Sequence, residues 1–227
     1  MRARGACYAV LALALLLPAT VRADEGAGAW ESIRNESGIQ VSRKVVAGSP
    51  FVAFRGEGDV TGSLLAVADV LVDVPHETEW MDSVREARIL RKVSDTEYIL
   101  YSHLGTPPTL TDREFVADVR LSVDPSRRSL TVEMRSVDDA AAPHTDYVRG
   151  LLTGSTFTLR ANPDGLTTHV IAEIHCDPKG SVPSWAVNFF QRSWGFNTIQ
   201  SLRKQVAGGH APVHPLLRDR LAEPQAG

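Results

Sequence analysis

Residues 184–206 read SWAVNFFQRSWGFNTIQSLRKQV, a stretch without proline. The large apolar side chains recur at helical spacing and form a wide aromatic face: Trp185, Val187, Phe189, Phe190, Trp194, Phe196, Ile199 and Val206. Gly208-Gly209 then predicts the end of the helix. The sequence therefore predicts one long amphipathic helix, and residues 208–227, which contain three prolines, are predicted to form a flexible tail.

The region before this helix has the alternation of antiparallel strands. Within 114–123, Phe115, Ala117, Val119 and Leu121 share one face while polar residues occupy the other. Strands are predicted at 87–93, 97–104, 114–123, 129–136, 151–161 and 167–176. Turn residues at 124–126 and 162–165 indicate that neighbouring strands run antiparallel.

The N-terminal third supplies a predicted hairpin and short helices. Runs 38–46 and 51–60 are joined by Ala-Gly-Ser-Pro, which is turn chemistry. Residues 63–73 (SLLAVADVLVD) predict a buried helix that ends before Pro75, and residues 76–82 predict a further helical turn. Residues 30–35 are predicted to form a short helix.

An antiparallel sheet must cover its apolar face, and the long helix is the available cover. The order of elements predicts an α+β fold of the helix-grip type. In this fold a curved antiparallel sheet wraps around a long C-terminal helix and leaves an internal apolar cavity.

The first 23 residues have the three parts of a secretory signal peptide. Arg2 and Arg4 precede the apolar run 9–17, and Val21-Arg22-Ala23 offers a cleavage site. The run is short for a membrane span, although an uncleaved anchor is the alternative. Cleavage near Ala23 predicts a periplasmic or secreted protein of 204 residues with Cys176 as its one cysteine, hence without an internal disulfide.

Composition narrows the function classes. The chain has 227 residues with 43% hydrophobic and 22% charged, as in an ordinary folded domain. Its net charge of -3 and its lack of a dense basic run argue against nucleic acid as a partner. A monomer is expected, because no long exposed apolar stripe is evident beyond the closing helix.

Three motifs in order resemble the StAR-related lipid-transfer (START) family. They are Trp80 to Leu90 (WMDSVREARIL), Asp112 to Val116 (DREFV), and a closing set of Lys179-Gly180, Pro183, Asn188 and Leu202-Arg203-Lys204. The resemblance covers about residues 30–207 and implies that 24–207 form one START-like lipid-binding domain. It implies lipid binding or transfer rather than catalysis, with no cofactor and no metal.

The resemblance implies a single lipid ligand held in the cavity and transient contact with a membrane. Phospholipid, fatty acid, hopanoid and sterol would all fit an apolar cavity. The closing helix is expected to act as a gate, together with the loop 139–147. The residues predicted to bind ligand are Tyr101, Phe115, Val119, Met134, Phe157, Val170, Ile174, Val187, Phe190 and Trp194. The aromatic residues of the helix could instead be core packing.

One departure from the family concerns the ligand. Sterol-binding members often carry a buried acid–arginine pair on adjacent strands. The corresponding positions here are Ser102 and Val119, while Arg120 lies on the other face. The departure argues against a sterol-type anchor and suits acyl chains.

Enzyme motifs are mostly missing. There is no Gly-x-Ser-x-Gly elbow, and His76-Glu77-Thr78-Glu79-Trp80 begins like a zinc helix but has no second histidine. The alternative function is an aromatase/cyclase-type enzyme of the same superfamily, acting on a small hydrophobic substrate. It predicts polar residues such as Tyr101, His103 and Arg160 inside the cavity.

Overall fold

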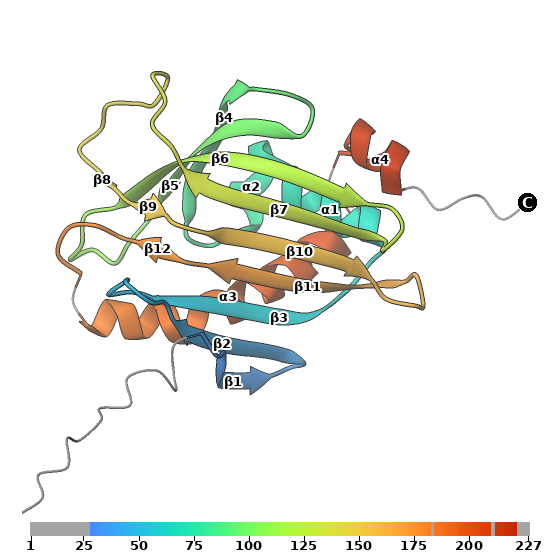
Figure 1. Ribbon diagram of the computed structural model, residues 1–227, viewed down its shortest axis with the longest axis horizontal. Coiled ribbons are helices and arrows are strands. Elements are labelled where there is room, and N and C mark those ends of the chain that lie inside the picture. Colours follow the sequence, from blue (N-terminus) through green and yellow to red (C-terminus); the bar gives the residue numbers. More distant parts are fainter. Residues whose placement is uncertain (1–27, 183, 210–211, 222–227) are drawn as a thin grey trace, which may run out of the picture.

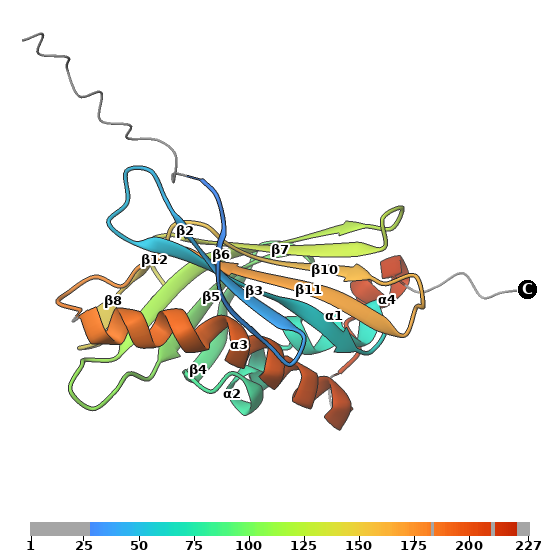
Figure 2. The ribbon, with the colours of Figure 1, turned by 90° about the horizontal axis from the view of Figure 1, so that it is seen from below.

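The computed structural model describes residues 28–182, 184–209 and 212–221, without the side chains of 184–192. An antiparallel sheet forms most of the molecule, and the long helix α3 (Ser184–Gly208) crosses its concave face (Figures 1 and 2). Both features confirm the predicted α+β helix-grip fold.

The main sheet has ten strands in the order β1-β2-β3-β11-β10-β7-β6-β5-β4, with β8 beside β6. Neighbours on this path are antiparallel, and β8 pairs with β6 in parallel. Its strands are β1 (Glu31–Glu36), β2 (Ile39–Val45), β3 (Val52–Thr61), β4 (Val84–Lys92), β5 (Glu97–Leu104), β6 (Arg113–Asp124), β7 (Ser129–Ser136), β8 (Val148–Arg149), β10 (Ser155–Ala161) and β11 (Thr167–Ile174). A separate pair joins β9 (Leu151–Leu152) to β12 (Cys176–Asp177).

The prediction of a helix at 30–35 is wrong, because these residues form the edge strand β1. β1 and β2 are joined by a two-residue loop, Ser37-Gly38, in which both φ angles are positive (53° and 68°). Positive φ at both loop residues matches the twist of a tight hairpin. The tight turn therefore pairs residues 31–36 with β2 and holds them as a strand.

Short helices fill the connection from β3 to β4. Helix α1 (Leu64–Val72) begins at Ser63, whose hydroxyl accepts a hydrogen bond from the Ala66 amide. A 3-10 turn (Val74–His76) carries Pro75 and leads into α2 (Glu77–Trp80). These elements match the predicted helix and the further turn. Among the described helices none is both long enough and apolar enough to cross a bilayer.

The prediction of a flexible tail from 208 onward fails at 215–221, which form helix α4 (Pro215–Leu221). Leu217 of α4 is fully buried in the main core, and the His214 amide donates to Asp69 of α1 over 2.9 Å. Burial of Leu217 and the hydrogen bond from His214 to Asp69 fix this short helix against α1.

Replacing Leu217 with alanine should lower the free energy of unfolding by about 2 kcal/mol, because a buried leucine is lost from a helix that can partly shift into the gap. Urea denaturation measures the change. Arg218→Ala, one residue along on the exposed side, is the control and should leave stability near that of the parent. Equal values for the two variants would contradict the packing of α4.

Helix α3 touches β3 through two glycines. A Cβ atom on Gly56 would lie 2.5 Å from the Gly195 carbonyl oxygen, and one on Gly195 would lie 2.9 Å from the Gly56 Cα. The backbones therefore meet with no side chain between them. Beyond this contact α3 packs into the core, where Ile199 and Leu202 are fully buried.

Candidate functional site

A cavity of about 470 Å³ lies between the sheet and α3 on the side of residue 194. Its wall is mostly apolar and includes Leu100, Phe115, Met134, Phe157 and Trp194. This volume is within the range of small-molecule and lipid sites.

The pairing register shows how the cavity is arranged along the strands. Paired residues share a face of the sheet, so Tyr98, Val119, Met134 and Ser155 form one row across β5, β6, β7 and β10. The next row contains Phe157 and Gly56, and α3 touches the sheet at Gly56. The cavity is therefore closed at this end, which we call the inner end.

The opposite end, which we call the mouth, is bounded by loops. Pro50 and Phe51 come from the β2–β3 hairpin, and Pro107 and Leu110 come from the β5–β6 loop, residues 105–112. Tyr98 and Leu104 stand six residues apart on β5, so the two ends are separated by roughly 20 Å at 3.3 Å per residue.

The predicted gate loop 139–147 lies elsewhere, and none of its residues lines the cavity. Ala142 packs against the outer face of the sheet, and the Tyr147 ring stacks on His103 with centroids 4.0 Å apart. The loop that borders the mouth is 105–112. Its Thr-Pro-Pro-Thr run between two strands is the sequence signal that could have indicated a prominent loop.

Five of the predicted ligand-binding residues line the cavity, namely Phe115, Met134, Phe157, Ile174 and Trp194. Val119 and Val170 are buried in the core cluster, outside the cavity wall. The side chains of Val187 and Phe190, like those of Trp185 and Phe189, lie outside the described residues.

Tyr101 is on the outer face of the sheet. Leu100, Ser102 and Leu104 line the cavity, so the alternation of β5 directs Tyr101 away from it. Its hydroxyl donates to Glu114 over 2.9 Å. The alternation alone would have excluded this residue from the wall.

Glu114 is the centre of a buried polar cluster on the outer face. It is 2% exposed and accepts hydrogen bonds from Tyr101 and from Arg149, whose Nη2 lies 2.7 Å away. Burial raises the pKa of Glu114, but the bonds from Arg149, Thr145 and Tyr101 outweigh it and hold the pKa below its ordinary value. The cluster ties β5, β6 and β8 together.

The polar residues expected by the enzyme alternative do not meet in the cavity. Neither Tyr101, His103 nor Arg160 lines it. His103 Nε2 lies 2.8 Å from Asp112 Oδ2, and Arg160 is exposed at the surface. This arrangement offers no convergent polar group from these three residues.

Among the described residues that line the cavity, Arg113 is the buried cation; it lies at the mouth and is 7% exposed. Its guanidinium donates to the carbonyl oxygens of Thr111, Pro178 and Lys179. Arg113 thus ties the β5–β6 loop to the segment that leads into α3.

Sequence reasoning missed Glu77, an acidic residue on the cavity wall. Burial raises the pKa of Glu77 to about 7. No sequence signal reveals this position, because α2 is brought to the cavity by the tertiary fold.

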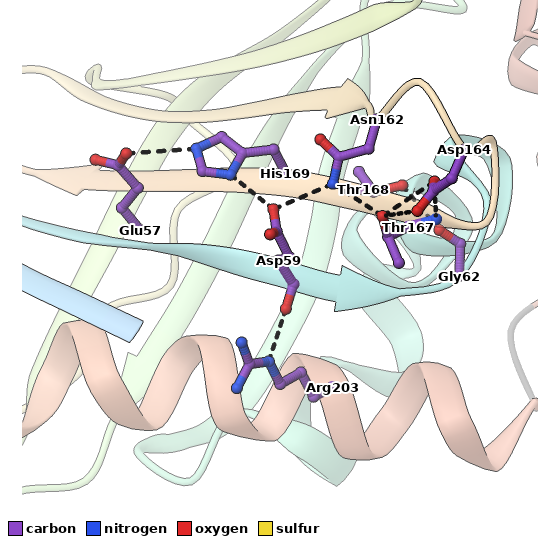
Figure 3. A network of polar contacts seen from close by, with 9 residues as sticks. All are labelled: Glu57, Asp59, Gly62, Asn162, Asp164, Thr167, Thr168, His169 and Arg203. Carbon is purple, nitrogen blue, oxygen red and sulfur yellow. Dashed lines mark hydrogen bonds and ion pairs between the residues drawn. The ribbon is translucent and has the colours of Figure 1, made fainter. Parts of the chain in front are cut away.

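The C-terminal half of α3 is fastened to the sheet by polar contacts (Figure 3). Arg203 Nε donates to the Asp59 carbonyl oxygen over 2.8 Å, and Arg203 Nη1 donates to the Ser37 carbonyl oxygen over 2.9 Å. The Asp59 carboxylate faces His169, with Oδ1 2.8 Å from Nδ1. This hydrogen bond lowers the pKa of Asp59.

Comparisons with known proteins agree with this geometry. Human StAR-related lipid transfer protein 5 superposes with a TM-score of 0.73 at 22% identity, covering 83% of this chain and 90% of that one. A STAR-related lipid transfer protein from Xanthomonas axonopodis superposes with a TM-score of 0.68 at 28% identity, covering 78% and 98%. Mouse phosphatidylcholine transfer protein is 24% identical over 186 residues, which are 80% of this chain and 85% of that protein.

The family model described as START domain matches residues 14–208, which is most of the chain. The sheet, the crossing helix and the apolar cavity between them are the features expected from that resemblance. The chain therefore belongs to the START domain family.

Proposed function

We propose that the protein binds a single lipid molecule in the cavity and transfers it between membranes. The observation that carries the proposal is the mostly apolar wall around about 470 Å³ between sheet and helix. Exposing a lipid chain to water costs about 0.8 kcal/mol per methylene, and such a wall removes that cost. The lipid-transfer names of the similar proteins support the same function.

Entry of the lipid requires the N-terminal half of α3 to move. The C-terminal half is held by core packing and by Arg203, whereas Trp194, directly before Gly195, lines the cavity. We therefore assign the gate to residues 184–194, acting with the loop 105–112 that borders the mouth.

The mouth is also the surface proposed to touch a membrane. Pro50, Phe51, Pro107 and Leu110 stand together around the opening. Apolar and aromatic groups suit the boundary between water and lipid. The leader-like segment supports action in the periplasm or outside the cell, after cleavage near Ala23, and the protein is expected to act as a monomer.

Native mass spectrometry of protein purified without detergent tests the proposal directly. A stoichiometric lipid adduct is expected, and organic extraction then identifies its class. Protein that is empty and also takes up no lipid from vesicles would refute lipid binding. Mass measurement of the exported protein tests cleavage at the same time.

Filling the cavity should block uptake. Ala117 is buried on the cavity wall, so Ala117→Trp puts an indole where the lipid lies and should reduce lipid uptake at least about tenfold. Ser122→Trp, on the same strand but exposed, is the matched control and should bind as the parent does. Normal uptake by a folded Ala117→Trp protein would show that the lipid binds elsewhere.

A further inference from the structure

We infer that the loop 139–147, which we call the outer loop, limits how fast a lipid enters and leaves, because its last residue, Tyr147, holds the loop 105–112 in place from outside the cavity. The inference rests on the proposed function and adds a positioning residue to it. The loop 105–112 is called the mouth loop below. Both loops are at the same end of the molecule, one between β7 and β8 and the other between β5 and β6 (Figure 1).

The mouth loop is closed on itself by Asp112, its last residue. Asp112 Oδ1 accepts a hydrogen bond from the Thr106 amide over 2.7 Å. The Thr106 hydroxyl oxygen lies 3.1 Å from the same carboxylate oxygen and 2.8 Å from the Leu110 carbonyl oxygen. The two ends of the mouth loop are therefore joined through one carboxylate, and they move together with it.

His103 connects this carboxylate to the outer face of the sheet. Its side chain is 11% exposed and alternates away from Ser102 and Leu104, which line the cavity. Its Nε2 lies 2.8 Å from Asp112 Oδ2. Burial raises the pKa of Asp112, but the hydrogen bonds from Thr106 and His103 outweigh it and hold the pKa below its ordinary value, so the carboxylate accepts and Nε2 donates. The mouth loop can swing outward only if this bond breaks or if His103 moves with it.

Tyr147 of the outer loop covers the His103 ring. The two rings are stacked, with centroids 4.0 Å apart and planes inclined by 14°. The next residue, Val148, donates its amide hydrogen to the Asp112 carbonyl oxygen over 3.0 Å and pairs with Arg113. The stack therefore keeps the imidazole directed at Asp112, beside the point where the mouth loop joins β6.

The outer loop is a firm support because it is itself fastened to the sheet. Arg91 of β4 donates to Asp139 over 2.9 Å. Arg149 of β8 donates to the Pro143 carbonyl oxygen over 3.0 Å. Ala142 packs on the small apolar cluster of the outer face. These attachments leave the ring at the end of the outer loop supported by the sheet.

A lipid passes the mouth on the way in and on the way out, so the support of the mouth loop acts on both rates. A stacked ring pair favours the closed arrangement by a factor of about five. Loss of the stack should therefore speed uptake and release alike and leave their ratio, the dissociation constant, unchanged. A residue of the cavity wall would change that ratio instead.

Stopped-flow fluorescence with a pyrene-labelled fatty acid measures both rates. Protein mixed with the probe gives the uptake rate, and loaded protein mixed with excess phosphatidylcholine vesicles gives the release rate. In Tyr147→Ala both rates should rise about fivefold at an unchanged dissociation constant. Tyr147→Phe keeps the ring and should behave as the parent does. Leu166→Ala removes an exposed side chain from the β10–β11 turn and is the control that should change neither rate.

Amide hydrogen exchange tests the support of the mouth loop without any lipid. The Thr106 and Leu110 amides are hydrogen-bonded within this loop. In Tyr147→Ala, peptides that cover 105–112 should exchange about fivefold faster, whereas peptides from β10 and β11 should exchange as in the parent. His103→Gln keeps an N–H donor but has no ring to stack, so it should show the same acceleration.

The outcomes distinguish the inference from the proposed function. Parent protein that takes up neither this probe nor lipid from vesicles refutes lipid binding, and the inference falls with it. Uptake by the parent, with rates and amide exchange unchanged in Tyr147→Ala, overturns only the support by Tyr147. A weaker dissociation constant in Tyr147→Ala, or equal acceleration in Tyr147→Phe, also overturns it, because ring stacking would then not be the cause. Thermal unfolding of Tyr147→Ala should stay close to that of the parent, because Tyr147 is 40% exposed.

Discussion

Placing a methyl group on either glycine at the crossing of α3 and β3 should destabilise the protein strongly. We expect Gly195→Ala and Gly56→Ala each to lower the free energy of unfolding by about 3 kcal/mol. The added Cβ would meet backbone atoms at 2.5–2.9 Å, and backbone cannot rotate aside as a side chain can. At Gly195 the clash outweighs the roughly 1 kcal/mol that alanine gains over glycine inside a helix.

Urea denaturation measures both variants, and Gly154→Ala is the matched control because a Cβ there meets nothing within 4 Å. The double variant should lower the free energy of unfolding by less than the sum of the two single variants, because both methyl groups push apart the same contact between α3 and β3. Single variants as stable as Gly154→Ala would mean that the helix does not rest on the sheet at this point.

Removing the guanidinium of Arg149 from the polar cluster around Glu114 should also lower the stability of the protein strongly. Arg149→Met leaves the carboxylate of Glu114 buried without its cation, which should cost about 3 kcal/mol at pH 7. The value is at the lower end for a broken buried pair because Arg149 itself is 37% exposed. Urea denaturation at neutral pH is the measurement.

The loss of stability in Arg149→Met should be smaller at low pH. The pKa of Glu114 is held below its ordinary value in the folded protein, so the pair stabilises the fold above the unfolded pKa of about 4.3 and stops doing so as pH falls through the folded pKa. Parent and Arg149→Met should therefore converge as pH falls through the folded pKa of Glu114. Arg43→Met, which breaks an exposed pair with Glu31, is the control and should have little effect at either pH. A constant difference at all pH values would rule out the electrostatic explanation.

The sequence predicted the strands and the closing helix well, because their signals are local. The alternation through Phe115 and Ala117 indicates which face of β6 points toward the cavity. Both residues line the cavity. The same rule places Tyr101 on the far face. That error came from choosing a residue by its type instead of by its position in the strand.

The remaining errors involve contacts between distant segments. The edge strand β1 depends on its pairing with β2, and α4 depends on the burial of Leu217. Glu77 is a charged residue in a short helix, and only the closure of α2 over the sheet brings it to the cavity. The structure at these positions depends on contacts with segments that are distant in the sequence, so no local sequence pattern predicts it.

In the gating movement that we propose, the glycine contact would also determine how far the N-terminal end of α3 travels. Residues 184–195 form a rigid arm of about 17 Å at 1.5 Å per residue, and its fulcrum is where two backbones touch without side chains. A tilt of about 20° about that fulcrum would carry the N-terminal end of the helix through about 6 Å, which is more than the spacing of neighbouring strands. Bare backbones can roll on one another without unlocking any side chain, so this leverage comes with little repacking at the crossing.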